Sequence, residues 1–546
     1  MHPADPTGVT GLDRVLMHSV PVSPDRAKPF CPTSHSAARA VQPEPSTHGR
    51  LGTQGNRVSP PPTPATVAGG LEPDELARQM RDDRVQERRS ERFANRRLLW
   101  RISNEKSVQC CGRGAVDSGA GVTIRSKGDR AYVSGVTRCS KIWLDPVCSA
   151  KIRANRSEEI SAALVRHIRA GGTAYMVTLT LQHHKRHALA DLMDSLRDAW
   201  KALLSGSQWA GDPKRGREGE RARMGVLGFV RSIEATYGDT HGWHPHLHVI
   251  LFLGARQTPR PSIPRKKDRP DGWVKPEWDP RPVEYFPVPD PSWDRSGMSP
   301  EAAQTAVDFE RMQQRWGRSW ERWTERFGFR AGIKHGVRWD RIASVSDAEA
   351  LGEYVAKVQD GKEHDGGRWH VGQEVARGDL KSGRQLGHGD GRRPNETPFE
   401  LLSRYRKLQS MTADEMENLA KIGVDVGQEL KRIRAIWHEW ERDTKDRRAM
   451  EWSRYLRSAL GLDEEEPTDT EIVAEEEHGE ERAHLSASAW ARVCRLGMDY
   501  TVLRTVETGG VAELVVLLAE IGLAADSTAD WIDQERKLLP NRGRPA

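Results

Sequence analysis

The segment GWHPHLHVILFL, residues 242–253, places three histidines on alternate positions and then continues as an apolar run. Successive side chains of a strand point to opposite faces, so His244, His246 and His248 share one face while Leu247 lies on the other. The pattern therefore predicts a β-strand with an apolar core face and an open histidine face. Histidines two residues apart can bind one cation, whereas a lone histidine is more often a surface or hydrogen-bonded core residue.

Neighbouring segments predict partners for this strand. Residues 226–238, VLGFVRSIEATYG, precede it with only DTHG between them, which predicts an antiparallel hairpin. Within that strand, Glu234 can project from the histidine face and add a carboxylate, although a solvated strand position is an alternative. TAYMVTLTL (173–181) and AGIKHGVRWDRI (331–342) predict two more strands. Helices are expected over 157–169, 187–204, 299–327 and 346–359.

The fold class predicted from these elements is α+β. We expect a central antiparallel β-sheet with helices on one of its faces, together with an N-terminal cysteine module and C-terminal helices. Of the 546 residues, 30% are charged and only 36% are hydrophobic, a balance that predicts disorder in part of the chain. The expected order is a disordered Pro-rich tail (1–75), a helix with a Cys-rich module (76–155), a central domain (156–410) with an insert (254–298), a helical region (411–465), an acidic linker (466–484) and a C-terminal helical unit (485–546).

Charge and hydropathy limit the classes of function. The net charge is +6 although the segment DEEEPTDTEIVAEEEHGEE is strongly acidic, so the rest of the chain is more basic than the total suggests. Such a balance is compatible with nucleic-acid binding. No run of about 20 apolar residues predicts a membrane span, and the N-terminus lacks a signal pattern. We therefore expect a cytoplasmic protein that does not bind membranes.

Two further patterns carry chemistry. Four of the six cysteines (Cys110, Cys111, Cys139 and Cys148) fall in one short region, which in a reducing compartment favours a metal site over disulfides. Tyr354 is followed three residues later by Lys357, on the expected helix 346–359. A phenol oxygen can attack a phosphodiester, and a lysine beside it can hold phosphate charge. Alone, this pattern is weak evidence for a catalytic tyrosine, because a tyrosine on a helix face more often packs against neighbouring residues.

Together, these motifs resemble the HUH endonuclease superfamily, and within it the rolling-circle plasmid replication initiators (Rep proteins) common in actinomycete plasmids. The TLT of Thr178–Thr180, the HLH of His246–His248 within GWHPHLHVILF, and the Y-x-x-K of Tyr354 match the three motifs of that family in order. The resemblance extends over about residues 105–480. It implies an HUH/RRM-like palm for the central sheet and an HUH endonuclease domain over 156–410.

The resemblance implies a metal-dependent single-strand DNA endonuclease. His246 and His248, with Glu234 as candidate third ligand, would hold Mg²⁺ or Mn²⁺. Tyr354 would attack a strand of the origin DNA and stay linked to the 5′ phosphate. The free 3′ hydroxyl would then prime synthesis by a host DNA polymerase, with a host helicase as a further partner. Lys357 would steady phosphate or tyrosinate charge.

Other residues have less defined roles in this scheme. Thr178, Thr180 and His244 are candidates for contacts with the substrate. Some family members use a glutamate one helical turn before the tyrosine to activate water for a second cleavage, but that position here is Ala350. Glu349 is the nearest substitute. The basic insert and residues 377–393 are candidates for phosphate contacts, with a solvated linker as the alternative for the insert.

The cysteine region resembles a zinc-binding module of the same family. In CSKIWLDPVCSAKI, Cys139 and Cys148 match, and Cys111 matches an earlier element. Asp145 stands where the family often has cysteine, and zinc accepts a carboxylate oxygen. Cys111, Cys139, Asp145 and Cys148 are therefore the candidate structural zinc ligands. Cys110 could replace the missing thiolate, and a degenerate module without metal is the other alternative.

Three rival functions follow from the same motifs. A conjugative relaxase usually carries its tyrosine before the histidine motif, whereas Tyr354 follows it. A single-strand transposase of the superfamily is usually much shorter and lacks the cysteine module. A catalytically inactive, zinc-stabilised DNA-binding regulator would have no need of His246, His248, Tyr354 and Lys357.

Overall fold

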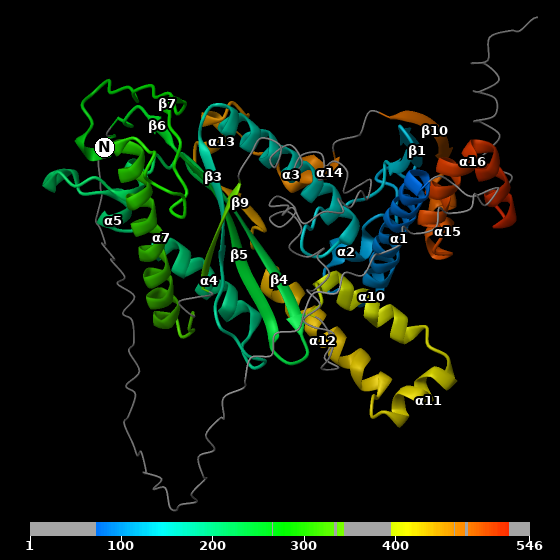
Figure 1. Cartoon of the computed structure of the whole chain (residues 1–546). Coiled ribbons are helices and arrows are strands. Elements are labelled where there is room, and N and C mark those ends of the chain that lie inside the picture. Colours follow the sequence, from blue (N-terminus) through cyan, green and yellow to red (C-terminus); the bar gives the residue numbers. More distant parts are fainter. Residues whose placement is uncertain are drawn as a thin grey trace, which may run out of the picture. The chain divides into compact units, whose positions relative to one another are not determined.

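The structure is a computed structural model that describes residues 73–261, 263–264, 266–331, 336–342, 395–463, 465–474 and 479–523 (Figure 1). The expected helix 346–359, which carries Glu349, Tyr354 and Lys357, lies outside the described residues. So do the basic segment 377–393 and most of the Pro-rich tail. Among the described helices, none combines the length and apolar composition needed to cross a bilayer.

The central sheet has five strands in the order β8-β3-β5-β4-β9, and every neighbouring pair is antiparallel. Its strands are β3 (Thr173–Leu179), β4 (Gly228–Gly238), β5 (Gly242–Leu253), β8 (Val337–Ile342) and β9 (Met450–Trp452). The predicted hairpin of β4 and β5 is confirmed. Gly242 begins β5 with a φ of +76°, and a Cβ there would lie 2.9 Å from the Cα of Lys185, so the turn requires glycine.

Helices cover both faces of this sheet, so the expectation of helices on one face was wrong. On one face, Leu247, Val249 and Leu251 share a core with residues of α4 (Leu189–Leu203), α7 (Pro300–Arg326) and α12 (Val426–Thr444). On the histidine face, Ile250 and Phe252 share a second core with α3 (Pro146–Arg169) and α13 (Leu456–Ala459). The reason is the composition of β5, which turns apolar on both faces after His248. A functional site on that face can therefore form only at the end that carries the histidines.

A second sheet, in the order β10-β1-β2, joins the two ends of the described chain. Its strands are β1 (Val122–Lys127), β2 (Arg130–Ser134) and β10 (Glu480–Leu485). They share a core with residues of α1 (Pro73–Ile102), α15 (Ala487–Arg495) and α16 (Asp499–Glu520). In α16, the fully buried carboxylate of Asp499 pairs with Arg96 and Arg97 of α1.

Three predicted boundaries differ from the structure. The acidic linker 466–484 contains α14 (Asp469–Ala474) and most of β10. In β10, Glu480 and Glu481 are exposed while Ala483 and Leu485 are buried, so the acidic composition concealed a strand that has one apolar side. Helix α3 runs across the expected boundary at 155, and β9 lies in a region expected to be helical. β9 has only three residues, too few to show a period.

The remaining elements complete the covering layers. They are α2 (Lys106–Cys110), α5 (Ser207–Ala210), α6 (Glu220–Arg223), β6 (Ala255–Gln257), β7 (Pro282–Tyr285), α10 (Pro398–Gln409) and α11 (Ala413–Lys421). β6 and β7 pair with each other inside the insert 254–298, so that part of the insert is a small antiparallel ribbon. Thr397 and Glu400 form a reciprocal capping box at the start of α10.

Candidate functional site

Strand register brings Glu234 together with two of the histidines. In the β4–β5 pair, Glu234 lies opposite His246, and His248 is the next residue on the same face. The Glu234 Oε2 atom lies 3.0 Å from Nε2 of His246 and 2.7 Å from Nε2 of His248. The side chains of Glu234 and His248 are only 3% and 1% exposed, whereas that of His246 is 15% exposed. The cluster is therefore open to solvent on the His246 side.

The charge of Glu234 is stabilised within the cluster. Burial alone acts to raise the pKa of its carboxyl, but the opposing charge of His246 and the hydrogen bonds from His246 and His248 outweigh burial. The pKa of Glu234 therefore lies well below its usual range. A buried carboxylate kept ionised beside two imidazoles is a set of ligands ready for a cation.

Thr178 of β3 orients the imidazole ring of His248. It lies opposite His248 in the β3–β5 pair, and its Oγ1 lies 3.2 Å from Nδ1 of His248. While Nε2–H of His248 donates to Glu234, the hydroxyl of Thr178 can donate to Nδ1. With a cation in place of that hydrogen bond, the same hydroxyl could accept from Nδ1–H, which would leave the Nε2 lone pair free for the cation. The ligand atoms of Glu234, His246 and His248 all lie within 4.8 Å of one another. Three ligands leave further positions of a divalent cation for water or phosphate oxygens.

Of the other predicted substrate contacts, His244 lies beside this cluster. The His244 ring centroid is 5.5 Å from that of His246 and 4.6 Å from that of His183. Desolvation, followed by the positive charge of His246, lowers the pKa of His244 to about 3. Thr180 lies one residue beyond β3, where its carbonyl accepts a hydrogen bond of 2.7 Å from the indole of Trp320. His183 was not predicted, although the run QHHKRH contains it.

The cysteine cluster also forms in the structure. Cys111 follows α2, Cys139 lies in the loop before α3, and Cys148 is in the first turn of α3. Their sulfur atoms are 3.6 Å apart between Cys111 and Cys148 and 3.9 Å apart between Cys139 and Cys148. Tetrahedral zinc with bonds of about 2.3 Å would place two sulfurs about 3.8 Å apart. Cys110 is exposed and does not belong to this group.

Asp145 completes the cluster through an oxygen without another function. Its Oδ1 accepts hydrogen bonds from the backbone N–H groups of Val147 and Cys148, at 2.8 and 2.9 Å, and so caps α3. Its buried Oδ2 has no hydrogen-bond partner among the described residues. Burial, followed by the nearby Cys111, raises the pKa of Asp145 to about 7. Three thiols and one orphaned carboxylate oxygen fit a tetrahedral zinc ion.

Comparisons with known proteins identify relatives in Streptomyces. No family model matches the chain, and no solved structure matches it. A "Neomycin resistance protein" of Streptomyces cyanogenus is 40% identical over 158 residues, which are 26% of this chain and 36% of that protein. "Protein rep" of Streptomyces lividans is 34% identical over 420 residues. This alignment covers 72% of the chain and 80% of the relative, and on this similarity the chain belongs to the family of the Streptomyces Protein rep.

Proposed function

We propose that the chain is a replication initiator that nicks one strand of a plasmid origin and remains attached to it through a tyrosine. The observation that carries the proposal is the convergence of Glu234, His246 and His248 in a member of the Protein rep family. A buried carboxylate and two imidazoles on one strand pair provide a cation site that keeps positions open for a phosphate.

The described residues would act by holding and orienting. Glu234, His246 and His248 would hold a divalent cation, Mg²⁺ or Mn²⁺, which when bound supplies Lewis-acid polarisation of the scissile phosphate. Thr178 would keep the ring of His248 in the required tautomer. The partly exposed His246 marks the side from which DNA would approach. The cysteine cluster, loaded with structural zinc, would brace the start of α3, the helix that covers the apolar part of the histidine face.

The covalent step belongs to Tyr354. Its phenol oxygen attacks the scissile phosphorus and forms a phosphotyrosine ester with the 5′ phosphate. The bond from phosphorus to the 3′ oxygen breaks, and that oxygen leaves as a hydroxyl after taking up a proton. The 3′ hydroxyl then primes synthesis by a host polymerase, with strand separation by a host helicase. Lys357 would balance charge on the phosphate, and Glu349 is the candidate base for a later hydrolysis.

A nicking assay tests this proposal. Purified protein is incubated with Mn²⁺ or Mg²⁺ and a labelled single-stranded oligonucleotide from the origin of its own replicon. We expect a nicked product and a protein–DNA adduct on a denaturing gel, and both should vanish with Tyr354→Phe. Tyr285→Phe is the matched control, since it removes a phenol hydroxyl from a tyrosine in the insert. Equal adducts from the wild type and Tyr354→Phe would reject the proposed nucleophile.

A further inference from the structure

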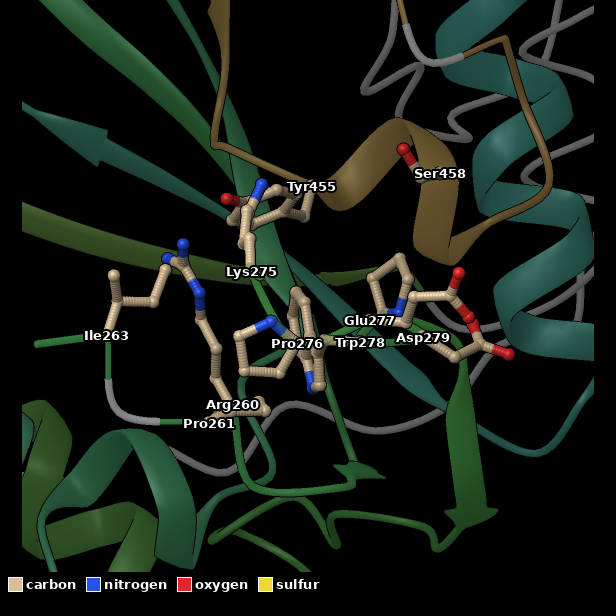
Figure 2. A pocket seen from close by; sticks show the side chains of 11 residues that line it. Arg260, Pro261, Ile263, Lys275, Pro276, Glu277, Trp278, Asp279, Tyr455 and Ser458 are labelled. Carbon is tan, nitrogen blue, oxygen red and sulfur yellow. The ribbon is translucent and has the colours of Figure 1, made fainter. Parts of the chain in front are cut away.

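A pocket of about 590 Å³ opens between the insert and the start of α13 (Figure 2). The insert contributes most of its wall, and Tyr455 and Ser458 close the other side. The lining residues are Arg260, Pro261, Ile263, Lys275, Pro276, Glu277, Trp278, Asp279, Pro280, Tyr455 and Ser458. A volume of this size is typical of sites that bind small organic groups.

Two aromatic side chains, those of Trp278 and Tyr455, line the pocket. The ring centroids of Trp278 and Tyr455 are 5.1 Å apart, with the planes at 80°. The indole N–H of Trp278 donates to the carbonyl of Thr258 over 2.9 Å, which fixes the orientation of the ring. Tyr455 has a φ of +67°, in the left-handed region that residues other than glycine rarely adopt. This backbone conformation costs free energy, and strained backbone of this kind often occurs at functional sites.

Positive charge surrounds these rings. The guanidinium carbon of Arg260 lies 4.9 Å from the centroid of Tyr455 and 5.9 Å from that of Trp278. The guanidinium carbon of Arg454 lies 4.7 Å from the centroid of Tyr455. Within the part of the chain that the structure describes, no ion pair is recorded for Arg260, Lys275 or Arg454.

The acidic side chains do not cancel this charge. The carboxylate of Asp279 is already paired with Arg281 over 2.6 Å. Within the described residues, Glu277 is then the one lining carboxylate that forms no ion pair. Two cations, Arg260 and Lys275, line the pocket, and a third, Arg454, lies beside the ring of Tyr455. Aromatic side chains with cations beside them that form no ion pair suit a ligand that combines a flat ring with negative charge.

The pocket lies on the same side of the central sheet as the histidines. Leu456, which follows Tyr455, belongs to the core that covers Ile250 and Phe252 on the histidine face. Trp452 of β9 pairs with Val230 of β4, and Glu234 is four residues further along β4. At the rise of a strand, those four residues span about 13 Å. The pocket and the Glu234 cluster therefore lie on one side of the sheet, and a DNA strand that reaches both would pass over the helices that cover the face between them.

We propose that this pocket binds an unstacked base of single-stranded DNA together with its neighbouring phosphates. The base stacks on Trp278, and the phosphates pair with Arg260, Lys275 and Arg454. This inference rests on the proposed function in one respect, since the strand is taken to be the one cut at the histidine cluster. It adds a second, distant contact on that strand. Stacking on aromatic rings tolerates any base, so the site would grip the strand without reading its sequence.

A proline-rich peptide is the main competing occupant, since aromatic pockets also bind such segments. The chain carries one in SPPPTPATV, residues 59–67. That segment has no acidic residue, so it would leave Arg260, Lys275 and Arg454 without a partner. The charge around the rings therefore favours a nucleic-acid strand.

The test uses the full chain carrying Tyr354→Phe, so that binding is measured without covalent attachment. Fluorescence anisotropy of a labelled oligothymidine gives the affinity. Trp278→Leu should weaken binding roughly tenfold, the change expected for loss of one stacked base, and Trp278→Phe should restore most of it. Arg260→Gln, at an exposed position, should also weaken binding. Trp293→Leu, an exposed tryptophan of the same insert, should leave the affinity unchanged.

Further experiments distinguish a DNA strand from other possible ligands of the pocket. A 4-thiothymidine oligonucleotide should cross-link to peptides that contain Trp278 or Tyr455. If Trp278→Leu binds oligothymidine as the parent does, while binding of free dTMP is lost, the pocket is a mononucleotide site and the proposal is wrong. Unchanged affinity for both ligands also overturns it. Strand binding that depends on Trp278 in a protein that never nicks DNA would support the pocket and reject the nuclease.

Discussion

Glu234 and His248 lie on neighbouring strands with Oε2 and Nε2 2.7 Å apart, and both side chains are buried. A buried carboxylate is costly unless it is paired, and here the two imidazoles of His246 and His248 provide the pairing. The same two nitrogens and one oxygen are the atoms that a divalent cation would use. The structure therefore shows a cluster whose internal hydrogen bonds a cation would replace.

Loss of the carboxylate should weaken cation binding more than it disturbs the fold. Glu234→Gln keeps the size of the side chain but removes its charge, so we expect Mn²⁺ affinity to fall by about tenfold or more. Isothermal titration calorimetry with Mn²⁺ measures this change. Glu451→Gln is the control, because it removes a carboxylate of the same sheet that pairs with Arg231 instead. Equal affinities in the wild type and Glu234→Gln would show that the cation does not bind there.

Thr178 is expected to act through His248. Thr178→Val keeps the shape of the side chain and the strand, but removes the hydroxyl that lies 3.2 Å from Nδ1 of His248. Partners of metal-bound histidines typically contribute about 10- to 100-fold to metal affinity or activity. We expect a loss in this range for Mn²⁺ binding with an unchanged melting temperature. A variant with full Mn²⁺ affinity would assign Thr178 to strand packing alone.

The cysteine cluster should hold one zinc ion. Asp145→Asn retains the N-cap of α3, because asparagine caps helices as well as aspartate does, but it loses the anionic ligand oxygen. We expect Asp145→Asn and Cys139→Ser to lower the zinc content measured by mass spectrometry of the metal. Cys110→Ser should retain a full equivalent, because Cys110 is exposed. Zinc lost from Cys110→Ser but kept in Asp145→Asn would reverse the assignment of the fourth ligand.

His167 makes stability depend on pH. Its Nε2–H donates to the carbonyl of Leu253 over 2.8 Å, and burial, the main cause, lowers the pKa of the ring to about 4. In the unfolded chain the ring takes up a proton near its ordinary pKa of 6.5. Its contribution to stability is therefore complete above that value and is lost as the pH falls toward 4.

Between about pH 7.5 and about pH 5, this one group should reduce the free energy of unfolding by about 2 kcal/mol. His167→Gln should be less stable at neutral pH but should show a smaller fall over the same range. Urea unfolding at the two pH values measures both slopes. Parallel slopes for the wild type and His167→Gln would contradict this role for His167.

The sequence predicts the local features of the site well. Alternation in GWHPHLHVILFL places His246 and His248 on one face, and the short turn DTHG fixes the register that puts Glu234 beside them. Both depend on residues close together in the chain. In the same way, the cysteine spacing and Asp145 predict a cluster that the structure forms.

Features that depend on distant contacts were not predictable. The side chains of Ile250 and Phe252 are apolar, but the sequence does not show that α3 and α13 cover them. Strand β9 is defined by pairing with β4 rather than by its own three residues. Likewise, Tyr455 comes near Trp278 only because the chain returns to the sheet after almost two hundred residues of sequence.

The most direct test of the account is to locate the covalent bond. Wild-type protein is reacted with an origin oligonucleotide and Mn²⁺, digested, and sequenced by tandem mass spectrometry. The account predicts a nucleotide phosphate on the side chain of Tyr354, and no such peptide from His248→Ala, which lacks a cation ligand. A phosphonucleotide on another residue, or the same Tyr354 adduct from His248→Ala, would contradict it.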